Sequence, residues 1–304
     1  MPFSCAMRAI LVHNSNAGDG RHPADELIDI LEEEGISASY YSTKDDAHRN
    51  ALRTTADLVI AAGGDGTVAK VASGLKHRKT PIAIIPLGTA NNVARSLGIP
   101  EGPKEAVESW RSARQRRFDV GVASGPWGRS TFLEATGAGA FAAAVAAAEK
   151  KDEPDAKPKK QKKLKAARSA FFKALKDAVP TSTRIVADGE RLPDGLLLVE
   201  IMNIGQMGPR LRLADAADSG DGYLDVVFLA EKGRKEMLDW LDSDDGKASA
   251  PVSSVRARKV SIDWDGAPLR VGDEMVEPRK AGGPVRVGLE REGIEMLVPH
   301  AVTA

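Results

Sequence analysis

The sequence predicts two domains, an N-terminal α/β domain with a parallel sheet and a C-terminal antiparallel β-sandwich. Three observations predict this fold class. The chain has 304 residues, which is longer than the length that a single hydrophobic core usually stabilises. Apolar strand runs alternate with helical segments up to residue 117, and short strands of period two follow from residue 118. We therefore assign 8–117 and 118–291 to the two domains, and expect that 292–300 could complete the first.

The strands of the first domain are near-continuous apolar runs. Such runs are typical of parallel strands that are buried on both faces. Each run is followed by a segment with helical spacing of its apolar residues. The expected strands are 9–12, 57–62 and 81–86, and the expected helices are 23–34, 68–75 and 91–97.

The second domain is marked by short alternating segments separated by Gly, Asp and Pro. This pattern is typical of an antiparallel sandwich. The expected strands are 118–123, 184–187, 196–202, 224–229, 255–264 and 285–289, with 293–299 as a last strand.

Composition excludes several classes of protein. The 43 basic and 43 acidic residues give no net charge, which argues against a nucleic-acid partner. Cys5 is the single cysteine, so an internal disulfide is excluded. No window reaches the roughly 20 apolar residues of a membrane span, and the first residues lack a signal-length apolar stretch. We expect a cytoplasmic protein.

Two segments carry unbalanced charge. Seven basic residues and no acid occur from Lys157 to Arg168, and four aspartates without a base occur from Asp215 to Asp225. The basic segment begins in a charge-rich stretch, 150–163, for which we expect a mobile loop. It leads into helical spacing around Phe171. Two interpretations stay open, a core-facing helix with solvated lysines or an element that rests on anionic lipid headgroups.

Three loops rich in Gly and Asn follow the three predicted parallel strands. They cover 14–18, 63–67 and 88–92. Loops after parallel strands meet at the carboxyl edge of the sheet, where ligands bind. Glycines let the backbone approach a ligand closely, and a following helix N-terminus offers N–H groups to phosphate. The sequence thus predicts a phosphate-binding rim, without the lysine of a GxxxxGK[ST] loop.

These motifs resemble the diacylglycerol kinase catalytic family, particularly its soluble bacterial members. The resemblance rests on Gly-Gly-Asp-Gly-Thr at 63–67 together with Pro-Leu-Gly-Thr-Ala-Asn-Asn at 86–92. It continues through Phe-Asp-Val-Gly at 118–121, the segment 132–141 and Asp-Gly-Tyr-Leu-Asp-Val at 221–226. The similar region spans roughly 8–300.

The resemblance implies that ATP binds the first domain and meets a lipid in a cleft between the two domains. It implies nucleotide contacts from Asn14, Gly63, Gly64, Asp65, Gly66, Thr67, Gly88, Thr89 and Asn91. It further implies that Asp65 and Asp119 organise a catalytic Mg²⁺ through water. Asp218, Asp221 and the Tyr223 backbone would form a second, structural Mg²⁺ site, for which a solvated turn is the alternative.

The catalytic base is where this sequence departs from the family. The family pattern is Asp-Gly-Glu near the end of the sandwich, whereas this chain has Val271-Gly272-Asp273-Glu274. A second match, Asp188-Gly189-Glu190, falls in an expected hairpin where such a turn also occurs for structural reasons. We predict Glu274 as the base that takes the proton of the lipid hydroxyl.

The predicted function is therefore an ATP-dependent lipid kinase in peripheral contact with a membrane, with diacylglycerol as the favoured acceptor. The sequence leaves open other lipid alcohols and whether the chain forms a homodimer. Two alternatives remain: an NAD kinase, which shares a Gly-Gly-Asp-Gly turn, and a catalytically idle nucleotide- or lipid-binding relative.

Overall fold

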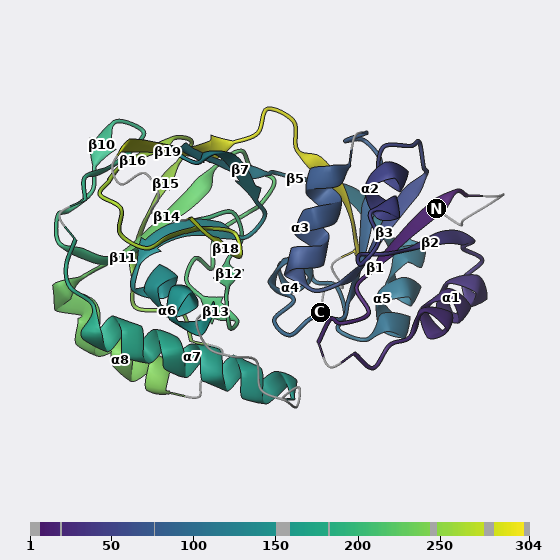
Figure 1. Ribbon diagram of the computed structural model, residues 1–304, viewed down its shortest axis with the longest axis horizontal. Coiled ribbons are helices and arrows are strands. Elements are labelled where there is room, and N and C mark those ends of the chain that lie inside the picture. The colour runs from purple at the N-terminus through teal and green to yellow at the C-terminus, as the bar shows by residue number, and fades with distance from the viewer. Residues whose placement is uncertain are drawn as a thin grey trace. The chain divides into compact units, whose positions relative to one another are not determined.

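Contacts along the chain separate it into two units. The computed structural model describes residues 7–18, 20–75, 77–149, 159–181, 183–243, 248–276 and 283–300. Unit 1 runs to Phe118 and includes the C-terminal stretch from Glu292, and unit 2 covers Asp119–Arg291 (Figure 1). The predicted fold class is confirmed, because unit 1 holds a mainly parallel sheet with helices and unit 2 holds antiparallel sheets. Across the described ranges, no helix is both long enough and apolar enough to cross a bilayer.

Unit 1 is built on a six-stranded sheet in the order β2-β1-β3-β4-β20-β5. The strands β2, β1, β3 and β4 pair in parallel, β20 is parallel to β4, and β5 is antiparallel to β20. Every residue of β1, β3 and β4 is buried, which explains their continuous apolar character. The bounds are β1 (Ala9–His13), β2 (Ala38–Ser42), β3 (Leu58–Gly63), β4 (Ile82–Pro86), β5 (Arg114–Phe118) and β20 (Ile294–Val298).

Helices cover this sheet and are joined to it by an apolar core. Leu27 and Leu31 of α1 pack with Trp110 against Leu11 and Ile60 of the sheet. The bounds are α1 (Ala24–Glu33), α2 (Ala47–Ala51), α3 (Asp65–Gly74), α4 (Asn92–Ser96) and α5 (Pro103–Ser109), with a short 3-10 helix at Trp110–Ser112.

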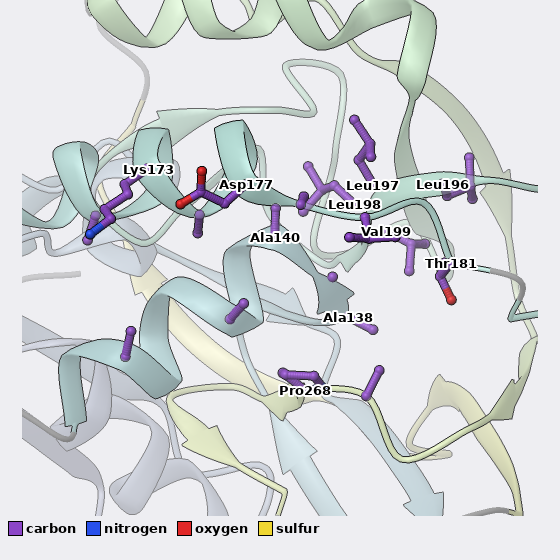
Figure 2. A pocket seen from close by; sticks show the side chains of 18 of the residues that line it. Ala138, Ala140, Lys173, Asp177, Thr181, Leu196, Leu197, Leu198, Val199 and Pro268 are labelled. Carbon is purple, nitrogen blue, oxygen red and sulfur yellow. The ribbon is translucent and has the colours of Figure 1, made fainter.

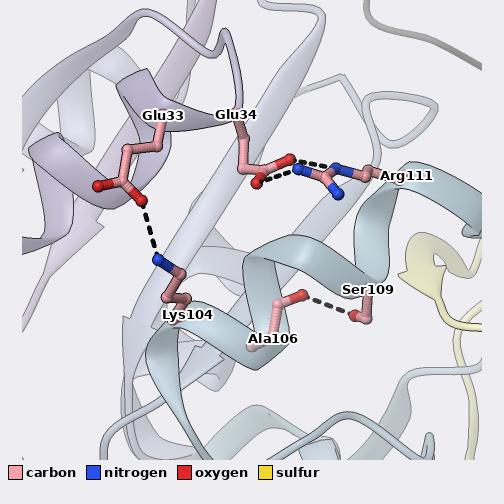
Figure 3. A network of polar contacts seen from close by, with 6 residues as sticks. All are labelled: Glu33, Glu34, Lys104, Ala106, Ser109 and Arg111. Atoms are coloured by element: carbon pink, nitrogen blue, oxygen red, sulfur yellow. Dashed lines mark hydrogen bonds and ion pairs between the residues drawn. The ribbon is translucent and has the colours of Figure 1, made fainter.

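Two ion pairs connect the end of α1 to the region of α5 (Figure 3). Lys104 Nζ lies 3.1 Å from Glu33 Oε2. Arg111 binds Glu34 through two parallel hydrogen bonds, of 2.6 Å from Nε and 2.7 Å from Nη2. A paired guanidinium and carboxylate fix orientation as well as distance. The two helices are thus held side by side on the sheet.

Unit 2 is a sandwich of two six-stranded antiparallel sheets, in the orders β10-β9-β16-β19-β6-β7 and β15-β14-β11-β8-β17-β18. Its core takes side chains from both sheets, including Ile262 and Val285 from the first and Val199 and Val226 from the second. The first sheet contains β6 (Gly121–Gly125), β7 (Gly128–Phe132), β9 (Ile185–Ala187), β10 (Glu190–Arg191), β16 (Val260–Trp264) and β19 (Gly283–Leu289). The second contains β8 (Ala135–Gly139), β11 (Leu196–Met202), β14 (Leu224–Ala230), β15 (Ser253–Ala257), β17 (Leu269–Val271) and β18 (Glu274–Met275), and β12 (Gln206–Met207) pairs with β13 (Leu211–Arg212).

Three helices, α6 (Ala140–Glu149), α7 (Lys160–Asp177) and α8 (Arg234–Asp242), form a second core with the β11–β14 sheet. The predicted helical spacing is that of α7, in which Phe171 and Leu175 are buried. Arg168 of the basic segment donates to the carbonyls of Leu241 and Trp240 at the end of α8, at 2.7 and 2.8 Å.

The core-facing interpretation therefore describes the apolar face of α7, whereas Lys162 and Lys165 on the same helix are exposed. Membrane contact by these lysines stays a prediction. Residues 150–158, which include Lys157 and most of the expected loop, lie outside the described residues.

Candidate active site

The three predicted Gly- and Asn-rich loops meet in unit 1, after the adjacent strands β1, β3 and β4. The Asn14 N–H donates to Ala62 O, and the Leu87 N–H donates to Gly63 O, both at 2.9 Å. A Cβ atom on Gly88 would lie 2.4 Å from Gly64 Cα, and one on Gly18 would lie 2.3 Å from Leu87 O. The loops thus touch backbone to backbone, which only glycine allows at these two positions.

Helix α3 begins directly in the second loop. Gly64 is its N-cap and supplies no side-chain hydrogen bond to the helix. The first N–H groups of an α-helix lack intrahelical partners, so this terminus suits an anionic ligand. Thr67 is buried, and a Cβ on Gly63 would lie 2.3 Å from its Oγ1. Close packing therefore fixes the turn between β3 and α3.

Asp65 and Asn91 link the second loop to the third. Asp65 Oδ1 accepts a 2.9 Å hydrogen bond from the Val93 N–H at the start of α4. Asn91 lies in the left-handed region at φ 54° and donates from Nδ2 to Pro86 O at 3.2 Å and to Gly88 O at 3.1 Å. The local sequence shows no packing role for Asp65, yet its carboxylate orders a helix 28 residues further along the chain.

Substituting Gly88 by Ala is expected to weaken the ATP binding that the sequence resemblance implies for this rim. The new Cβ would collide with the Gly64 backbone, which cannot swing aside as a side chain can. Overpacking typically costs about 1–3 kcal/mol. If this free energy distorts the loops that bind the ligand, the affinity falls roughly 5- to 150-fold. Calorimetric titration with ATP measures this loss.

Gly74→Ala is the matched control for this substitution. Gly74 ends α3, at the opposite end of that helix from the rim, and its Cβ would meet the end of the Leu52 side chain, Cδ1, at 2.9 Å. We expect it to bind ATP like the wild type. If Gly88→Ala bound ATP with wild-type affinity, the close contact between Gly88 and Gly64 would not be needed for ATP binding.

His13 is a residue near the rim that sequence reasoning did not select. It ends β1 just before Asn14, is fully buried, and its Nδ1 lies 3.2 Å from the Tyr40 hydroxyl. Burial lowers the pKa of His13, and His22 and Lys44 lower it further. The imidazole is therefore neutral at pH 7 and adds no positive charge to the rim. A histidine at the end of an apolar strand is a weak signal, because the sequence does not give its burial.

In unit 2, Glu274 lies at the start of β18, on a two-residue hairpin turn formed by Gly272 and Asp273. Val271 pairs with Glu274 across the turn, and the Glu274 side chain is exposed. Gly272 has φ +60°, whereas Asp273 is not among the residues with positive φ. A positive φ at the first turn position alone is the pattern of a type II′ turn, which favours Gly there. The transposed order Gly-Asp is thus a coherent turn sequence.

A buried ion pair supports this hairpin from the interior of the sandwich. Arg270 and Glu200 are both buried, with Arg270 Nη2 2.7 Å from Glu200 Oε2. Arg270 Nη1 donates to Gly272 O at 2.6 Å, inside the turn itself. The guanidinium also lies 4.8 Å from the ring centroid of Phe141. The turn that carries Glu274 is therefore anchored to the interior of the sandwich.

Glu200 is expected to make the stability of unit 2 depend on pH. Burial raises the pKa of Glu200 to about 7, although Arg270 opposes the rise. Between about pH 4.5 and 7 the unfolded chain has lost this proton and the folded chain keeps it, so the stability of the folded state falls as pH rises through this range. Denaturant unfolding at pH 5 and pH 8, followed by tryptophan fluorescence, measures the change.

Glu200→Gln should lose less stability over this range than the wild type. Glu190→Gln, at an exposed hairpin position, should keep the wild-type pH dependence. Equal pH dependence in Glu200→Gln and the wild type would show that Glu200 does not titrate in this range.

The second Asp-Gly-Glu match forms a hairpin with a different task. Asp188 and Gly189 both have positive φ between β9 and β10, as a type I′ turn requires. Asp188 accepts hydrogen bonds from the Arg258 and Lys259 N–H groups, at 2.9 and 2.8 Å. The Asp188 carboxylate thus fastens one strand connection to another, a structural role.

Asp119 lies against the acidic loop of unit 2. The expected strand over 118–123 is divided here, because Phe118 ends β5 in unit 1 and β6 begins at Gly121 in unit 2. Asp119 is buried, its Oδ2 accepts from the Gly222 N–H at 2.8 Å, and its N–H donates to Ser219 O at 2.5 Å. Asn203 Nδ2 donates to Asp119 O at 2.8 Å.

The carboxylates of this loop bind the loop's own N–H groups. Asp218 Oδ1 accepts from Gly220, and Asp221 Oδ1 accepts from Tyr223, both at 2.9 Å. Arg256 forms an ion pair with Asp221 Oδ2. In the part of the chain that the structure describes, no three acidic, histidine or cysteine side chains converge as metal ligands. The two Mg²⁺ sites therefore stay predictions.

Comparison with known proteins gives matches over both units. The family model described as "Diacylglycerol kinase catalytic domain" matches residues 8–123, and "YegS C-terminal NAD kinase beta sandwich-like domain" matches 139–301. A "Diacylglycerol kinase" of Bacillus subtilis is 26% identical over 245 residues, 76% of each chain. A "Probable lipid kinase YegS-like" of Klebsiella pneumoniae is 42% identical over 102 residues, about a third of each chain.

Solved structures show the same fold at lower identity. A diacylglycerol kinase from Bacillus anthracis matches with a TM-score of 0.69 at 20% identity, covering 97% of this chain and 98% of that one. Yeast NADH kinase in complex with NADH matches with a TM-score of 0.56 at 11% identity, covering 97% and 84%. At these identities the structural likeness concerns the fold alone.

Proposed function

This chain belongs to the diacylglycerol kinase catalytic family of lipid kinases, and from that premise we propose that it transfers the γ-phosphate of ATP to the hydroxyl of a membrane lipid. Diacylglycerol, giving phosphatidic acid, is the acceptor we favour. The observation that carries the proposal is the backbone contact of three glycine-bearing loops beside the N-terminus of α3, where the N-cap Gly64 supplies no side-chain hydrogen bond. Such an arrangement binds phosphate through N–H groups rather than through a lysine.

The phosphate donor is assigned to unit 1. In this proposal the N–H groups at Gly64, Asp65 and Gly66 bind the ATP phosphates, and Asn14, Thr67, Thr89 and Asn91 complete the site. Mg²⁺ accompanies ATP in phosphoryl transfer and neutralises developing charge. Asp65 is the acid that would hold it, through water, at this rim.

The general base is assigned to unit 2. An exposed carboxylate can accept a proton from an attacking hydroxyl if its position is fixed. The Glu274 backbone is fixed by pairing with Val271 and by the bond from Arg270 to Gly272 O. Glu190 also pairs across its turn, with Ala187, but Asp188 holds that turn to the Arg258 and Lys259 N–H groups, and within the described residues no buried arginine anchors it.

A membrane supplies the acceptor, so we propose peripheral contact. Lys162 and Lys173 on α7 are exposed and would attract anionic headgroups over about 10 Å. The cytoplasmic face of a membrane, which carries anionic lipids, suits such a contact.

Two other functions make different predictions in one assay. Purified protein is incubated with labelled ATP and either a total lipid extract or NAD. The lipid kinase proposal expects label in a lipid product and none in NAD. Label in NADP instead would establish the NAD kinase alternative. ATP binding without label in either acceptor would establish that the chain is a catalytically idle relative. The transposed order Gly272-Asp273 is the reason for considering this alternative.

A further inference from the structure

The acidic loop of unit 2, residues 218–223, contacts both the carboxylate and the backbone of Asp119. The Gly222 N–H donates to Asp119 Oδ2 at 2.8 Å, and the Asp119 N–H donates to Ser219 O at 2.5 Å. Asp119 is buried and belongs to the same unit as the loop. The position of this carboxylate therefore depends on what keeps the loop ordered.

Arg256 lies among the acidic side chains of this region. Its strand β15 pairs with β14 so that Arg256 is opposite Asp225, and directly opposed residues of an antiparallel pair have neighbouring side chains. The Arg256 Nη2 group donates to Asp221 Oδ2, and the guanidinium lies 4.3 Å from the ring centroid of Tyr223. One positive charge, which strand pairing holds in place, thus contacts the loop through a carboxylate and an aromatic ring.

Both carboxylate oxygens of Asp221 are engaged inside the protein, which does not suit the structural Mg²⁺ that the sequence predicts here. Oδ1 accepts from the Tyr223 N–H at 2.9 Å, and Oδ2 pairs with Arg256. Mg²⁺ takes near-octahedral oxygen ligands at about 2.0–2.1 Å, and a guanidinium on one of those oxygens would repel it. Over the described ranges no three acidic, histidine or cysteine side chains form a metal-binding group. The arrangement fits a loop ordered by an arginine.

We propose that Arg256 takes the place of the predicted structural Mg²⁺ and orders the loop that positions Asp119. Arg256 is a positioning residue in this proposal, since it acts on Asp119 through Asp221 and the backbone of the loop. The replacement of the metal ion concerns the folded chain without ATP and does not depend on the reaction. The effect on Asp119 rests on the proposed kinase function, for which the resemblance gives Asp119 a role at the catalytic Mg²⁺.

Thermal unfolding of the full chain without nucleotide, in excess EDTA and again in excess Mg²⁺, tests the replacement. Arg256→Gln removes the charge but keeps much of the side chain. In EDTA we expect its Tm to fall by about 2–4 °C, a modest loss because the ion pair is partly exposed. Excess Mg²⁺ should recover most of this loss by binding the released Asp221 carboxylate. The wild type and Arg256→Lys, which keep a positive charge, should show no such recovery.

Arg258→Gln is the matched control. Arg258 stacks on the same Tyr223 ring, at 4.6 Å, but its removal leaves the ion pair of Arg256 with Asp221 in place. It should show the wild-type response to Mg²⁺. Any effect of Mg²⁺ on unit 1 is common to all variants and cancels in the comparison. Equal Tm values for Arg256→Gln and the wild type in EDTA, or an equal rise of both in Mg²⁺, would overturn the proposal.

Kinetics at two concentrations of Mg²⁺ test the positioning of Asp119. With Mg²⁺ equal to a saturating concentration of ATP, Arg256→Gln should lower kcat by about 10- to 100-fold, the scale of a small displacement at a reacting centre. Excess Mg²⁺ should restore most of this rate, and so should Arg256→Lys. The wild type should need no Mg²⁺ beyond that bound to ATP. The same dependence of kcat on excess Mg²⁺ in Arg256→Gln and the wild type would overturn the positioning role.

Failure of this inference is distinguishable from failure of the proposed function. A wild type that is inert on every lipid would count against the kinase, and the unfolding comparison would still decide whether Arg256 replaces the metal ion. An active wild type whose Arg256→Gln variant matches it in both Tm and kcat would leave the kinase in place and remove the role of Arg256.

Discussion

Glu274→Gln is expected to lower kcat for lipid phosphorylation by about 10²–10⁴-fold, the usual contribution of a positioned general base. Gln has nearly the same shape but cannot accept the hydroxyl proton. The affinity for ATP should be nearly unchanged, because the nucleotide is assigned to unit 1 and Glu274 belongs to unit 2. The measurement is the initial rate at saturating ATP, with ATP binding determined separately by calorimetry.

Glu190→Gln is the matched control, since Glu190 also follows a two-residue turn and is exposed. It should keep activity within a few fold. If Glu190→Gln were the inactive variant, the roles of the two hairpins would have to be exchanged. If both variants kept full activity, the base would be a different group.

The turn itself gives a finer test of the same assignment. Exchanging the order, with Gly272→Asp and Asp273→Gly together, replaces a type II′ sequence by the Asp-Gly pair that favours type I′. Both turn types close a two-residue hairpin, so Glu274 should stay opposite Val271 and activity should be retained or raised. Gly272→Asp alone places a side chain at φ +60° and should lower activity through strain. Activity appearing only in the exchanged variant would mark the natural chain as the idle relative.

Asp65→Asn is expected to reduce kcat by about 10²–10³-fold, the scale of losing one preorganised electrostatic group at a reacting phosphate. Asn keeps an oxygen that can accept the hydrogen bond from Val93, so the start of α4 should stay ordered. Asp65→Ala removes that hydrogen bond as well and should also destabilise unit 1 by about 0.5–2 kcal/mol.

Rates at saturating ATP and Mg²⁺, together with thermal unfolding, distinguish the two effects. The expected pattern is loss of rate in both variants and loss of stability in Asp65→Ala alone. An Asp65→Asn enzyme with normal kcat would remove Asp65 from the catalytic machinery and leave it a structural role.

The central part of unit 1 could be predicted from sequence because its signals are local. The strands β1, β3 and β4 are interior strands with every residue buried, so their composition alone marks them. The glycine loops that follow these strands lie together because parallel strands end at the same edge of the sheet. The edge strands β2 and β5 escaped prediction because half-exposed strands, such as Arg-Gln-Arg-Arg-Phe in β5, lack that composition.

The features that escaped prediction depend on contacts between distant residues. The bond from Asp65 to Val93 spans 28 residues, and the ion pair of Arg270 with Glu200 spans 70. The apolar cavity of about 1110 Å³ in unit 2 (Figure 2) is invisible in the alanine run of α6, because alanine favours a helix whether it borders a cavity or a core.

The most direct test of lipid kinase activity is the conversion of pure diacylglycerol by the purified chain with γ-labelled ATP and Mg²⁺. A lipid kinase should form labelled phosphatidic acid in equal amount with ADP, and Glu274→Gln should reduce both products together. Formation of ADP without labelled lipid, or no transfer to diacylglycerol or to any other lipid alcohol tested while ATP still binds, would contradict it.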